Sequence, residues 1–477
     1  MTIDRIELTL KPKLAVLSDE QISRIHSATA EILERTGVKI THAKALEILH
    51  GAGAKVDGNR VRIPAWMVDD AVQKSPSQVF LGNRNGVRSV ILDGSTSWFG
   101  SSLDCVDYLD PVTEERRPFT SEDCRTAATL SDALPNYTWG MTFGLIADVP
   151  VNIADRIAAR QALAYSEKPL VFCCKDINSL KDIYEMAILI AGGERQFHDS
   201  PSIVLLTDPI SPLVHADSVI ETMLFCAEKG IPQICYSGLQ AGSTAPMTFG
   251  GAIAQGSAES LSGLVLTQLA AQGAPFVYGA FATVMDMRTT IFSYGAPEMS
   301  LMVAAMAQMA QYYKLPFFGT AGCSDAKYPD PQAAAEAAYS CLSSALSGAD
   351  LVHDCGLLDH GSLVSPAYIV LVNEVLHMVN QYLRGVPISE ETLALDLIDS
   401  VGPGKHYLQA EHTLKHCHDV WYSRLFERSL YTKWLGRGGK RFSERLREQT
   451  LGLMKHQPAP LPSEITKELD RMATQWE

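Results

Sequence analysis

From about Trp98 to about Pro387, short apolar runs alternate with longer amphipathic stretches, and this rhythm constrains the fold more than any other feature. Alternating strands and helices imply an α/β fold with a parallel sheet. About eight repeats without a dinucleotide-binding fingerprint favour closure into a (β/α)8 TIM barrel over an open sheet. The predicted strands are Ser97–Leu103, Tyr137–Ile146, Leu170–Cys174, Ile203–Thr207, Gln233–Tyr236, Phe276–Gly279, Phe317–Ala321 and Leu351–Cys355.

The segments on either side of the barrel have different patterns. Before it, Ser18 and Thr41 are predicted to cap two helices, and the Asp57-Gly58 turn predicts a hairpin, which together indicate an α+β unit. After it the strand pattern ends, and glycine-punctuated helical stretches follow. The chain is therefore expected to divide into an N-terminal α+β unit, a catalytic barrel and a C-terminal helical appendage, at 1–95, 96–387 and 388–477.

Composition excludes several classes of function. The net charge of −14 disfavours binding to nucleic acid or to an anionic membrane surface. The sequence has no run of about 18 uncharged apolar residues, so no membrane span is expected. The charged segment Met1–Lys13 does not resemble a secretion signal, and the ten cysteines are scattered, so a reduced, cytoplasmic protein is expected. The low charged fraction of 20% favours buried subunit interfaces and hence a homo-oligomer.

Barrel enzymes carry their chemistry at the carboxyl ends of the strands. In this chain those ends are rich in aromatic and acidic residues. Aromatic faces with a carboxylate suit a permanently cationic ammonium group, because each desolvated cation–π contact contributes roughly 0.5–2 kcal/mol. Core packing is the alternative interpretation of each aromatic residue. The candidates at or near strand ends are Phe99, Asp104, Phe143, Lys175, Asp208, Tyr236, Tyr278, Phe281, Ser324 and His353.

Common catalytic motifs are missing: the sequence contains no GxGxxG, P-loop, GxSxG or HExxH pattern. The stretch from His353 to His360 contains zinc-ligand residue types, but at no usual zinc spacing. Lys175 could form a Schiff base in a desolvated pocket, although Asp176 beside it favours a solvated ion pair. A barrel lyase or hydrolase using Lys175 or a metal at His353 is therefore one alternative, and a non-catalytic osmolyte-binding protein is another.

Short segments spread over the chain are distinctive when taken together. They are Asp107-Tyr-Leu-Asp-Pro-Val-Thr-Glu-Glu-Arg-Arg-Pro-Phe-Thr, Leu134-Pro-Asn, Pro246-Met-Thr with Gly251, Ala258-Glu259, Gly273-Ala-Pro, Tyr278-Gly279, Asp286-Met-Arg, Ala296-Pro-Glu, and Ala321-Gly-Cys-Ser-Asp-Ala-Lys with Asp330 and Gln332. In combination they resemble the trimethylamine methyltransferase family over essentially the whole chain.

The resemblance implies a barrel methyltransferase that moves a methyl group from a methylated amine to the cob(I)alamin of a separate corrinoid protein, with no tightly bound cofactor and no metal of its own. The archetypal members contain pyrrolysine. This sequence has only standard residues, so it resembles the non-pyrrolysine branch, whose members act on quaternary amines such as glycine betaine. A quaternary ammonium leaves as a neutral tertiary amine, so no proton has to be supplied, and orientation is worth up to about 7–11 kcal/mol.

Site roles follow as hypotheses from this implied reaction. Strong anionic binding would stabilise the cationic ground state, so an aromatic box with a modest polar side is expected, and not a buried carboxylate pair. Asp208 or Asp104 would supply the counter-charge. His353, Arg288 or Lys175 would contact the other end of the substrate, which in a betaine is a carboxylate. The predicted box consists of Phe99, Phe143, Tyr236, Tyr278 and Phe281.

Overall fold

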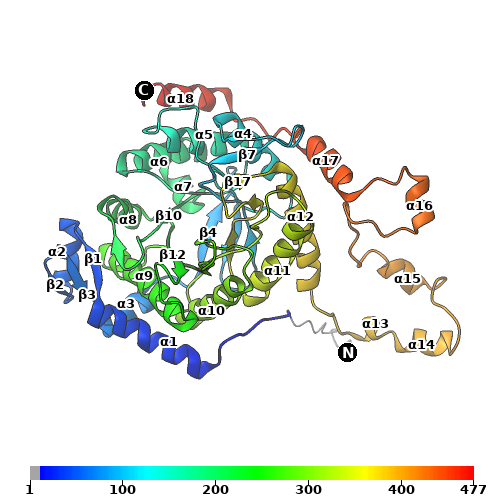
Figure 1. Cartoon of the computed structure of the whole chain (residues 1–477), viewed down its shortest axis with the longest axis horizontal. Coiled ribbons are helices and arrows are strands. Elements are labelled where there is room, and N and C mark those ends of the chain that lie inside the picture. Colours follow the sequence, from blue (N-terminus) through cyan, green and yellow to red (C-terminus); the bar gives the residue numbers. More distant parts are fainter. Residues whose placement is uncertain (1–10, 477) are drawn as a thin grey trace.

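The computed structural model describes residues 11–476 and confirms the TIM barrel (Figure 1). Seven parallel strands pair in the order β6-β15-β14-β13-β12-β10-β9. They are β6 (Trp98–Phe99), β9 (Leu170–Phe172), β10 (Ile203–Thr207), β12 (Gln233–Ala241), β13 (Phe276–Val284), β14 (Phe317–Thr320) and β15 (Leu351–His353). The predicted second strand is reduced to Trp139 and Gly140, and it closes the ring through parallel bridges to Gly100 and Leu170.

Two of the strands are longer than predicted. β12 and β13 stay in register over nine residue pairs, from Gln233 with Phe276 to Ala241 with Val284. They therefore extend past the other strands as a two-stranded ribbon at the carboxyl end of the barrel.

One long helix follows each strand and covers the outside of the barrel. These helices are α4 (Ser121–Ala133), α5 (Ala154–Tyr165), α6 (Ile177–Ala191), α8 (Asp217–Lys229), α9 (Phe249–Ala270), α10 (Pro297–Tyr313), α11 (Pro331–Ser347) and α12 (Pro366–Leu383), with a short α7 (Glu194–Asp199) after α6. α9 is buried without interruption from Ala252 to Gln268, because β12 and β13 cover one side and the N-terminal helices the other.

The N-terminal unit wraps around α9 and the base of the barrel. Its elements are α1 (Asp19–Glu31), the π-helical turn η1 (Ile32–Thr36), β1 (Val38–Ile40), α2 (Ala43–Gly51), β2 (Lys55–Asp57), β3 (Arg60–Arg62), α3 (Ala65–Lys74), β4 (Val79–Gly82) and β5 (Arg88–Leu92). Ser18 caps α1 as predicted. The cap of α2 is His42, and not Thr41 as predicted, because the Thr41 hydroxyl bonds Asp217 of α8 instead.

This unit is tied to the barrel at both ends. β1 pairs with β11 (Val214–His215), a short strand in the loop after β10. The β4–β5 hairpin covers the amino-terminal ends of the strands, where the Gly82 N–H donates to the Pro201 carbonyl at 2.7 Å and the Gly94 N–H to Asp350 Oδ1 at 2.7 Å. The expected division at 1–95, 96–387 and 388–477 stays a prediction, and the shared sheet joins the first two segments.

At the opposite end, a small sheet joins the first and last loops of the barrel. β7 (Asp107–Leu109) pairs with β8 (Arg116–Pro118) and with β17 (Leu363–Val364), which pairs with β16 (Leu357–Leu358). The small sheet therefore fixes the loops after β6 and β15 against each other.

The C-terminal appendage is helical, as predicted. It contains α13 (Glu390–Leu393), α14 (Leu395–Val401), α15 (Glu411–His416), α16 (Tyr431–Gly436), α17 (Phe442–Leu453) and α18 (Ser463–Ala473). α17 packs on α12, and α18 packs on α5 and α6, whereas α13 to α16 stand away from the barrel (Figure 1).

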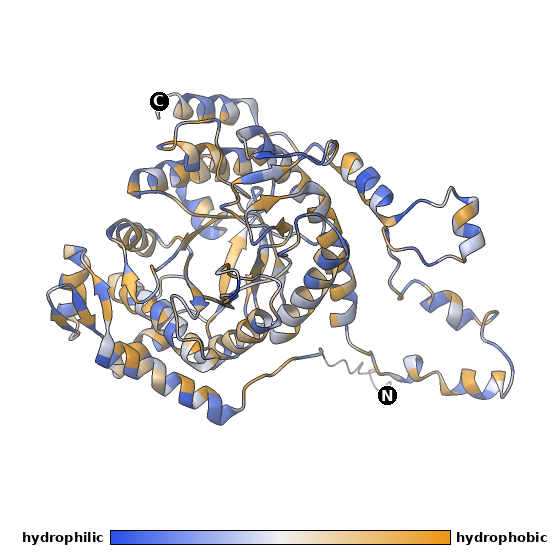
Figure 2. Ribbon diagram, viewed as in Figure 1, coloured by the Kyte–Doolittle hydropathy of each residue, from blue (hydrophilic) through white to orange (hydrophobic). Residues whose placement is uncertain are grey.

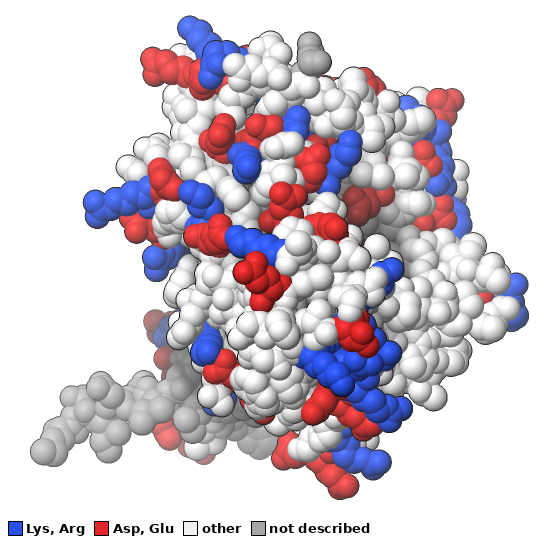
Figure 3. Space-filling model, turned by 90° about the vertical axis from the view of Figure 1, so that its left-hand side faces the viewer, with Lys and Arg blue, Asp and Glu red and all other residues white. Residues whose placement is uncertain are grey.

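Surface and cysteine features agree with the composition. Within residues 11–476, no helix is long and apolar enough to cross a membrane. Acidic and basic side chains are interspersed on the face drawn in Figure 3, and the described residues there form no broad basic patch. All ten cysteines are free thiols. The segment Met1–Lys13, considered above as a secretion signal, lies almost wholly outside the described residues.

The closure of the barrel generates a stability prediction. A Cβ at Gly100 would overlap the indole ring of Trp139, so Gly100→Ala is expected to lower the free energy of unfolding by about 1–3 kcal/mol. Thermal and urea unfolding of the purified variant measure this change. The matched control is Gly452→Ala in α17, where nothing lies within 4 Å and helix propensity predicts equal or higher stability. A Gly100→Ala protein as stable as the control would contradict tight closure at this point.

Candidate active site

Two carboxylates stand at the carboxyl ends of the strands, which together with the following loops are here called the barrel mouth. Asp104 follows β6 and Asp208 follows β10, and water reaches both side chains. Burial by the surrounding protein, and then the charge of Asp354, raises the pKa of Asp104 to about 6. Burial, and then the charge of Asp104, raises the pKa of Asp208 to about 7. The mouth is thus acidic, with carboxyl groups that titrate near neutral pH.

A third carboxylate, Asp354, is fixed by the ends of three neighbouring strands. It accepts hydrogen bonds from Ser102 Oγ at 2.5 Å and Thr320 Oγ1 at 2.6 Å, and its Oδ2 lies 3.1 Å from His353 Nδ1. Burial alone would raise the pKa of Asp354, but the charge of His353 and these hydrogen bonds outweigh it and lower the pKa below its usual value. The side chain of His353 packs edge-on against the Phe318 ring at 4.3 Å.

A column of aromatic rings rises from His353 toward the rim of the mouth. The Tyr236 ring lies 4.9 Å from His353 and stacks on Phe281 at 6.1 Å, and Phe281 stacks on Tyr294 at 5.3 Å. Phe292 lies 5.4 Å from Tyr294. This set, Tyr236, Phe281, Tyr294 and Phe292, is here called the ring column, and it offers the aromatic faces that a quaternary ammonium needs.

Three aromatic residues predicted for the box do not line the barrel interior. Tyr278 faces outward, where its hydroxyl bonds Ser257 Oγ of α9 at 2.7 Å and its ring lies 6.0 Å from Tyr313 of α10. The reason is strand alternation: Tyr278 and Phe281 are three residues apart on β13 and must point to opposite faces.

Phe99 and Phe143 also face away from the barrel interior, for related reasons. Phe99 pairs in register with Val352, the neighbour of His353, so Phe99 and His353 face opposite sides of the sheet. Phe143 has a positive φ of 64° that turns the chain, and its side chain is buried in a small recess between α4 and α5. Of the five predicted box residues, the structure brings together Tyr236 and Phe281.

The remaining candidates are exposed to solvent or bonded to other groups. The side chain of Lys175 is exposed, and its backbone N–H donates to Asp155 Oδ2 at 2.8 Å. Arg288 is 93% exposed in the loop after β13. Ser324 is buried and donates to Glu336 Oε2 at 2.5 Å, so its hydroxyl orders the loop after β14. Neither cation is placed to meet a substrate held at Tyr236.

Sequence reasoning missed Phe292, Tyr294 and Phe318. Phe318 lies at the second position of β14, below the strand end. Phe292 and Tyr294 lie beyond β13, in a loop that folds back so that Phe292 bridges Met285. The close pair of aromatic residues after a long apolar strand was the available signal, but their return to the mouth depends on that fold-back.

The rim of the mouth carries many exposed apolar side chains. Nine large apolar side chains on the loops that follow the strands are 46% to 83% exposed. They are Val106, Val112, Leu145, Val151, Ile210, Met247, Met287, Ile291 and Tyr328. Such a concentration of exposed apolar side chains marks an interaction surface.

The rim also carries an ordered charged cluster. His360 Nδ1 lies 2.8 Å from Asp325 Oδ1, and the His360 ring is 6.3 Å from Phe292 at the end of the ring column. Lys327 Nζ lies 3.3 Å from His360 Nε2 and 2.9 Å from Asp359 Oδ1.

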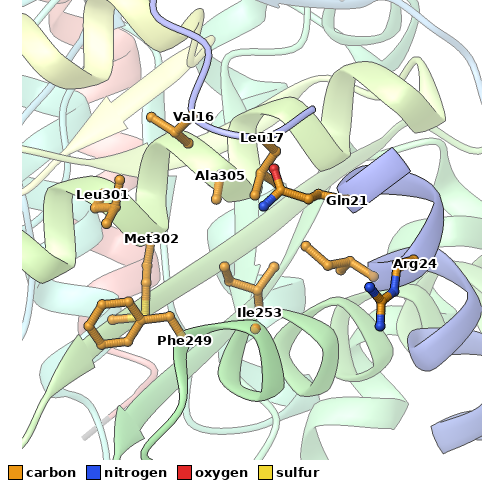
Figure 4. A pocket seen from close by; sticks show the side chains of 11 residues that line it. Val16, Leu17, Gln21, Arg24, Phe249, Ile253, Leu301, Met302 and Ala305 are labelled. Carbon is orange, nitrogen blue, oxygen red and sulfur yellow. The ribbon is translucent and has the colours of Figure 1, made fainter. Parts of the chain in front are cut away.

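A separate recess of about 330 Å³ lies outside the barrel, between α1, α9 and α10 (Figure 4). Its lining is largely apolar, with Leu17, Ile253 and Met302 among the side chains that face it, and none of the lining residues is acidic. It therefore lacks the counter-charge that a cationic substrate requires.

The geometry does not favour the metal-dependent or Schiff-base chemistry considered as alternatives. In the described part of the chain, no three His, Cys, Asp or Glu side chains are grouped so as to hold a metal ion. The Cys355 thiol is directed to the Ala321 carbonyl at 3.4 Å. Lys175 is exposed and so lacks the desolvated surroundings of a Schiff-base lysine.

The whole chain is similar to known proteins. The family model described as trimethylamine methyltransferase (MTTB) matches residues 4–475. The trimethylamine methyltransferase MttB of Desulfitobacterium hafniense is 32% identical over 467 residues, which cover 97% of this chain and 94% of the relative. A glycine betaine methyltransferase of another Desulfitobacterium hafniense strain is 29% identical over 428 residues, 89% of each chain. The solved monomethylamine methyltransferase MtmB of Methanosarcina barkeri aligns with 97% of this chain and 88% of that chain, at 9% identity and a TM-score of 0.47. The chain therefore belongs to the trimethylamine methyltransferase family, the family that its sequence segments resemble.

Proposed function

We propose that this protein transfers a methyl group from a quaternary amine, glycine betaine or a related betaine, to the cob(I)alamin of a separate corrinoid protein. The ring column beside the carboxylates of Asp104 and Asp208 is the observation that carries the proposal. One relative, the glycine betaine methyltransferase, is named for a quaternary amine and supports this class of substrate, whereas the MttB relative is named for trimethylamine, a tertiary amine.

The ring column would bind the trimethylammonium group through its ring faces. Tyr236, Phe281 and Tyr294 stack with interplanar angles of 24° and 27°, so they form a continuous aromatic wall along one side of the mouth. Each desolvated contact contributes roughly 0.5–2 kcal/mol, which is enough to hold and orient a small cation when two or three rings act together.

Asp104 and Asp208 add a moderate electrostatic attraction for the cation to this binding. Asp208 or Asp104 was expected to supply the counter-charge; because both residues follow strands at the mouth, we propose that they share this role. Their raised pKa values, about 6 and about 7, mean that near pH 7 the two groups together carry less than two full charges. A moderate negative potential suits the reaction, because charge leaves the nitrogen in the transition state and excess ground-state binding would slow transfer.

For the carboxylate of a betaine we propose partners other than the three predicted residues, His353, Arg288 and Lys175. Lys175 and Arg288 are exposed to solvent, and neither side chain packs on a ring of the ring column. His360 and Lys327 stand at the outer end of that column instead, and they are our candidates for the second end of the substrate. His353 at the inner end stays a candidate for orienting Tyr236 and the bound amine.

The reaction requires that the substrate be oriented and that water be excluded from the site, and it requires no general acid. The corrinoid supplies a Co(I) nucleophile; as the cobalt–carbon bond forms, the carbon–nitrogen bond breaks and its electron pair stays on nitrogen. The tertiary amine leaves neutral, so no residue of this chain has to donate a proton. Its side chains hold one methyl group toward the open mouth and limit water, and well-aligned binding is worth up to about 7–11 kcal/mol.

The apolar rim suits a large methyl acceptor. A corrinoid is too wide to enter the barrel, so it must be presented over the mouth by its own protein. Ile210, Met247 and Met287 lie on three different loops of the rim and are 50% to 66% exposed, as a docking surface requires.

The central test is demethylation by the purified protein with a reduced corrinoid acceptor. We expect a quaternary amine such as glycine betaine to be converted to its tertiary amine, detected by mass spectrometry. Tyr236→Leu removes three ring contacts and should lower kcat/KM about 10-fold or more. Tyr278→Phe, on the outer face of β13, is the control and should stay within about twofold. Equal losses in both variants, or activity on trimethylamine with none on any quaternary amine, would contradict the proposal.

A pH dependence follows from the raised pKa of Asp208. Its carboxyl group is neutral on the acid side of about pH 7 and charged on the alkaline side, so the affinity for tetramethylammonium should rise between about pH 6 and pH 8. Calorimetric titration across pH 5–9 measures this rise. Asp208→Asn should bind more weakly at pH 8 and lose the inflection near pH 7, whereas the exposed Glu122→Gln should keep it. An unchanged inflection in Asp208→Asn would remove Asp208 from the site.

The rim predicts an effect specific to the acceptor. The double change Met247→Gln and Met287→Gln keeps side-chain size but adds polarity, so it should raise the KM for the corrinoid protein several-fold. The loss should be clearly smaller with free cob(I)alamin, which needs no protein interface. Val87→Gln, exposed on the hairpin at the other end of the barrel, is the control. Losses of the same size with both acceptors would place the effect in the reaction centre instead.

A further inference from the structure

Part of the C-terminal appendage stands apart from the barrel. Residues 386–441, here called the arm, contain α13 to α16, and Figure 1 shows them as a loop of short helices beside α12. The arm is held at both ends, since α12 leads into it and α17 packs back on α12.

The arm is also anchored in the middle. Glu374 of α12 accepts hydrogen bonds from Ser423 Oγ at 2.5 Å and from the Arg424 N–H at 2.9 Å. Leu425 beside them is buried. The arm is therefore positioned by the barrel although most of it does not touch the barrel.

Large apolar side chains of the arm face solvent. Thirteen of them are 40% to 81% exposed, and Figure 2 shows apolar segments recurring along the arm helices. They are Val386, Ile388, Leu393, Leu395, Ile398, Tyr407, Leu408, Leu414, Val420, Tyr422, Leu430, Tyr431 and Leu435. Together they expose on the order of 1,000 Å², more than the roughly 800 Å² that each partner buries in a standard stable interface.

The helices of the arm need an external partner. α13 to α16 are four to seven residues long, and none contains a buried residue. Isolated helices shorter than about 12–15 residues are marginal in water, so helices of this length depend on packing. The first ten residues of the chain carry only four large aliphatic side chains, Ile3, Ile6, Leu8 and Leu10, too few to cover thirteen.

We propose that a second copy of this chain covers the arm, in a twofold homodimer in which each arm packs against the other subunit. The cover must be permanent, because the helices need it in order to fold, and a copy of the same chain is always present in equal amount. A corrinoid protein that docks at the rim must bind and dissociate in each turnover, so it cannot provide permanent cover. The rim is also formed by loops that are not part of the arm. Exposed Tyr339 of α11 and Tyr382 of α12 add further apolar surface to the helices beside the arm.

The oligomeric state tests this proposal. By size-exclusion chromatography with light scattering, the full-length protein is expected to be a dimer at micromolar concentration. Leu408→Asp and Leu430→Asp, which lie in different parts of the arm and are 81% and 79% exposed, should each shift it toward monomer and weaken association at least 100-fold. Val87→Asp, an equally apolar exposed site on the β4–β5 hairpin, should leave the dimer intact.

Limited trypsin digestion gives a second readout that does not depend on size. Lys405, Lys415, Arg428 and Lys433 lie in the arm and should be protected in the wild type but cleaved in the aspartate variants. Should an aspartate variant be insoluble, Leu408→Ser and Leu430→Ser serve the same purpose with a smaller perturbation. A monomeric wild type with a trypsin-sensitive arm, or a dimer that survives all four changes in the arm, would overturn the proposal.

Discussion

The closed ring of parallel backbone hydrogen bonds is the constraint on which the rest of this structure depends. The shortest pairing in this ring is at the second strand, where Trp139 bridges Gly100 and Gly140 bridges Leu170 with few hydrogen bonds. Because the ring closes, the carboxyl ends of all the strands meet at one mouth, and residues as distant in sequence as Asp104, Asp208 and Asp354 come under each other's charge. An open sheet of the same strands would leave β6 and β9 at opposite edges.

Closure also decides which side chains serve the site, through strict alternation along each strand. Tyr236 and Phe281 point inward and begin a stack that Tyr294 and Phe292 complete from a returning loop. Tyr278, on the same strand as Phe281, points outward and packs against α9 and α10. Under the proposed function, the inner face of β13 serves binding and its outer face serves packing, so a conservative change at Tyr278 should alter packing before it alters chemistry.

The electrostatics of the mouth fit a substrate whose charge disappears during the reaction. Asp354 is held ionised by His353, Ser102 and Thr320. Burial, and then the charge of Asp354 for Asp104 and of Asp104 for Asp208, raises the pKa of these two groups to about 6 and about 7. The site can therefore attract a cation without binding it so strongly that the neutral product state becomes unfavourable. The protein also has two exposed apolar surfaces, the rim of the mouth and the arm away from the barrel, for which we propose a transient acceptor protein and a permanent second subunit as the respective partners.

The sequence by itself determined the barrel, the order of its elements and the acidic, aromatic character of the mouth, because these depend on local periodicity and on the rule that strand ends share one edge. Tyr236, Phe281, Asp104 and Asp208 were assigned to the mouth in this way, and their roles there stay predictions. Only the tertiary structure decided that Phe99, Phe143 and Tyr278 face away, that Thr41 bonds Asp217 in place of capping α2, and that Phe292 and Tyr294 return to the mouth. The direction of a side chain depends on the residue at which its strand begins to alternate, and the path of the loop after β13 depends on contacts between distant segments. Neither can be predicted from the local pattern of residues.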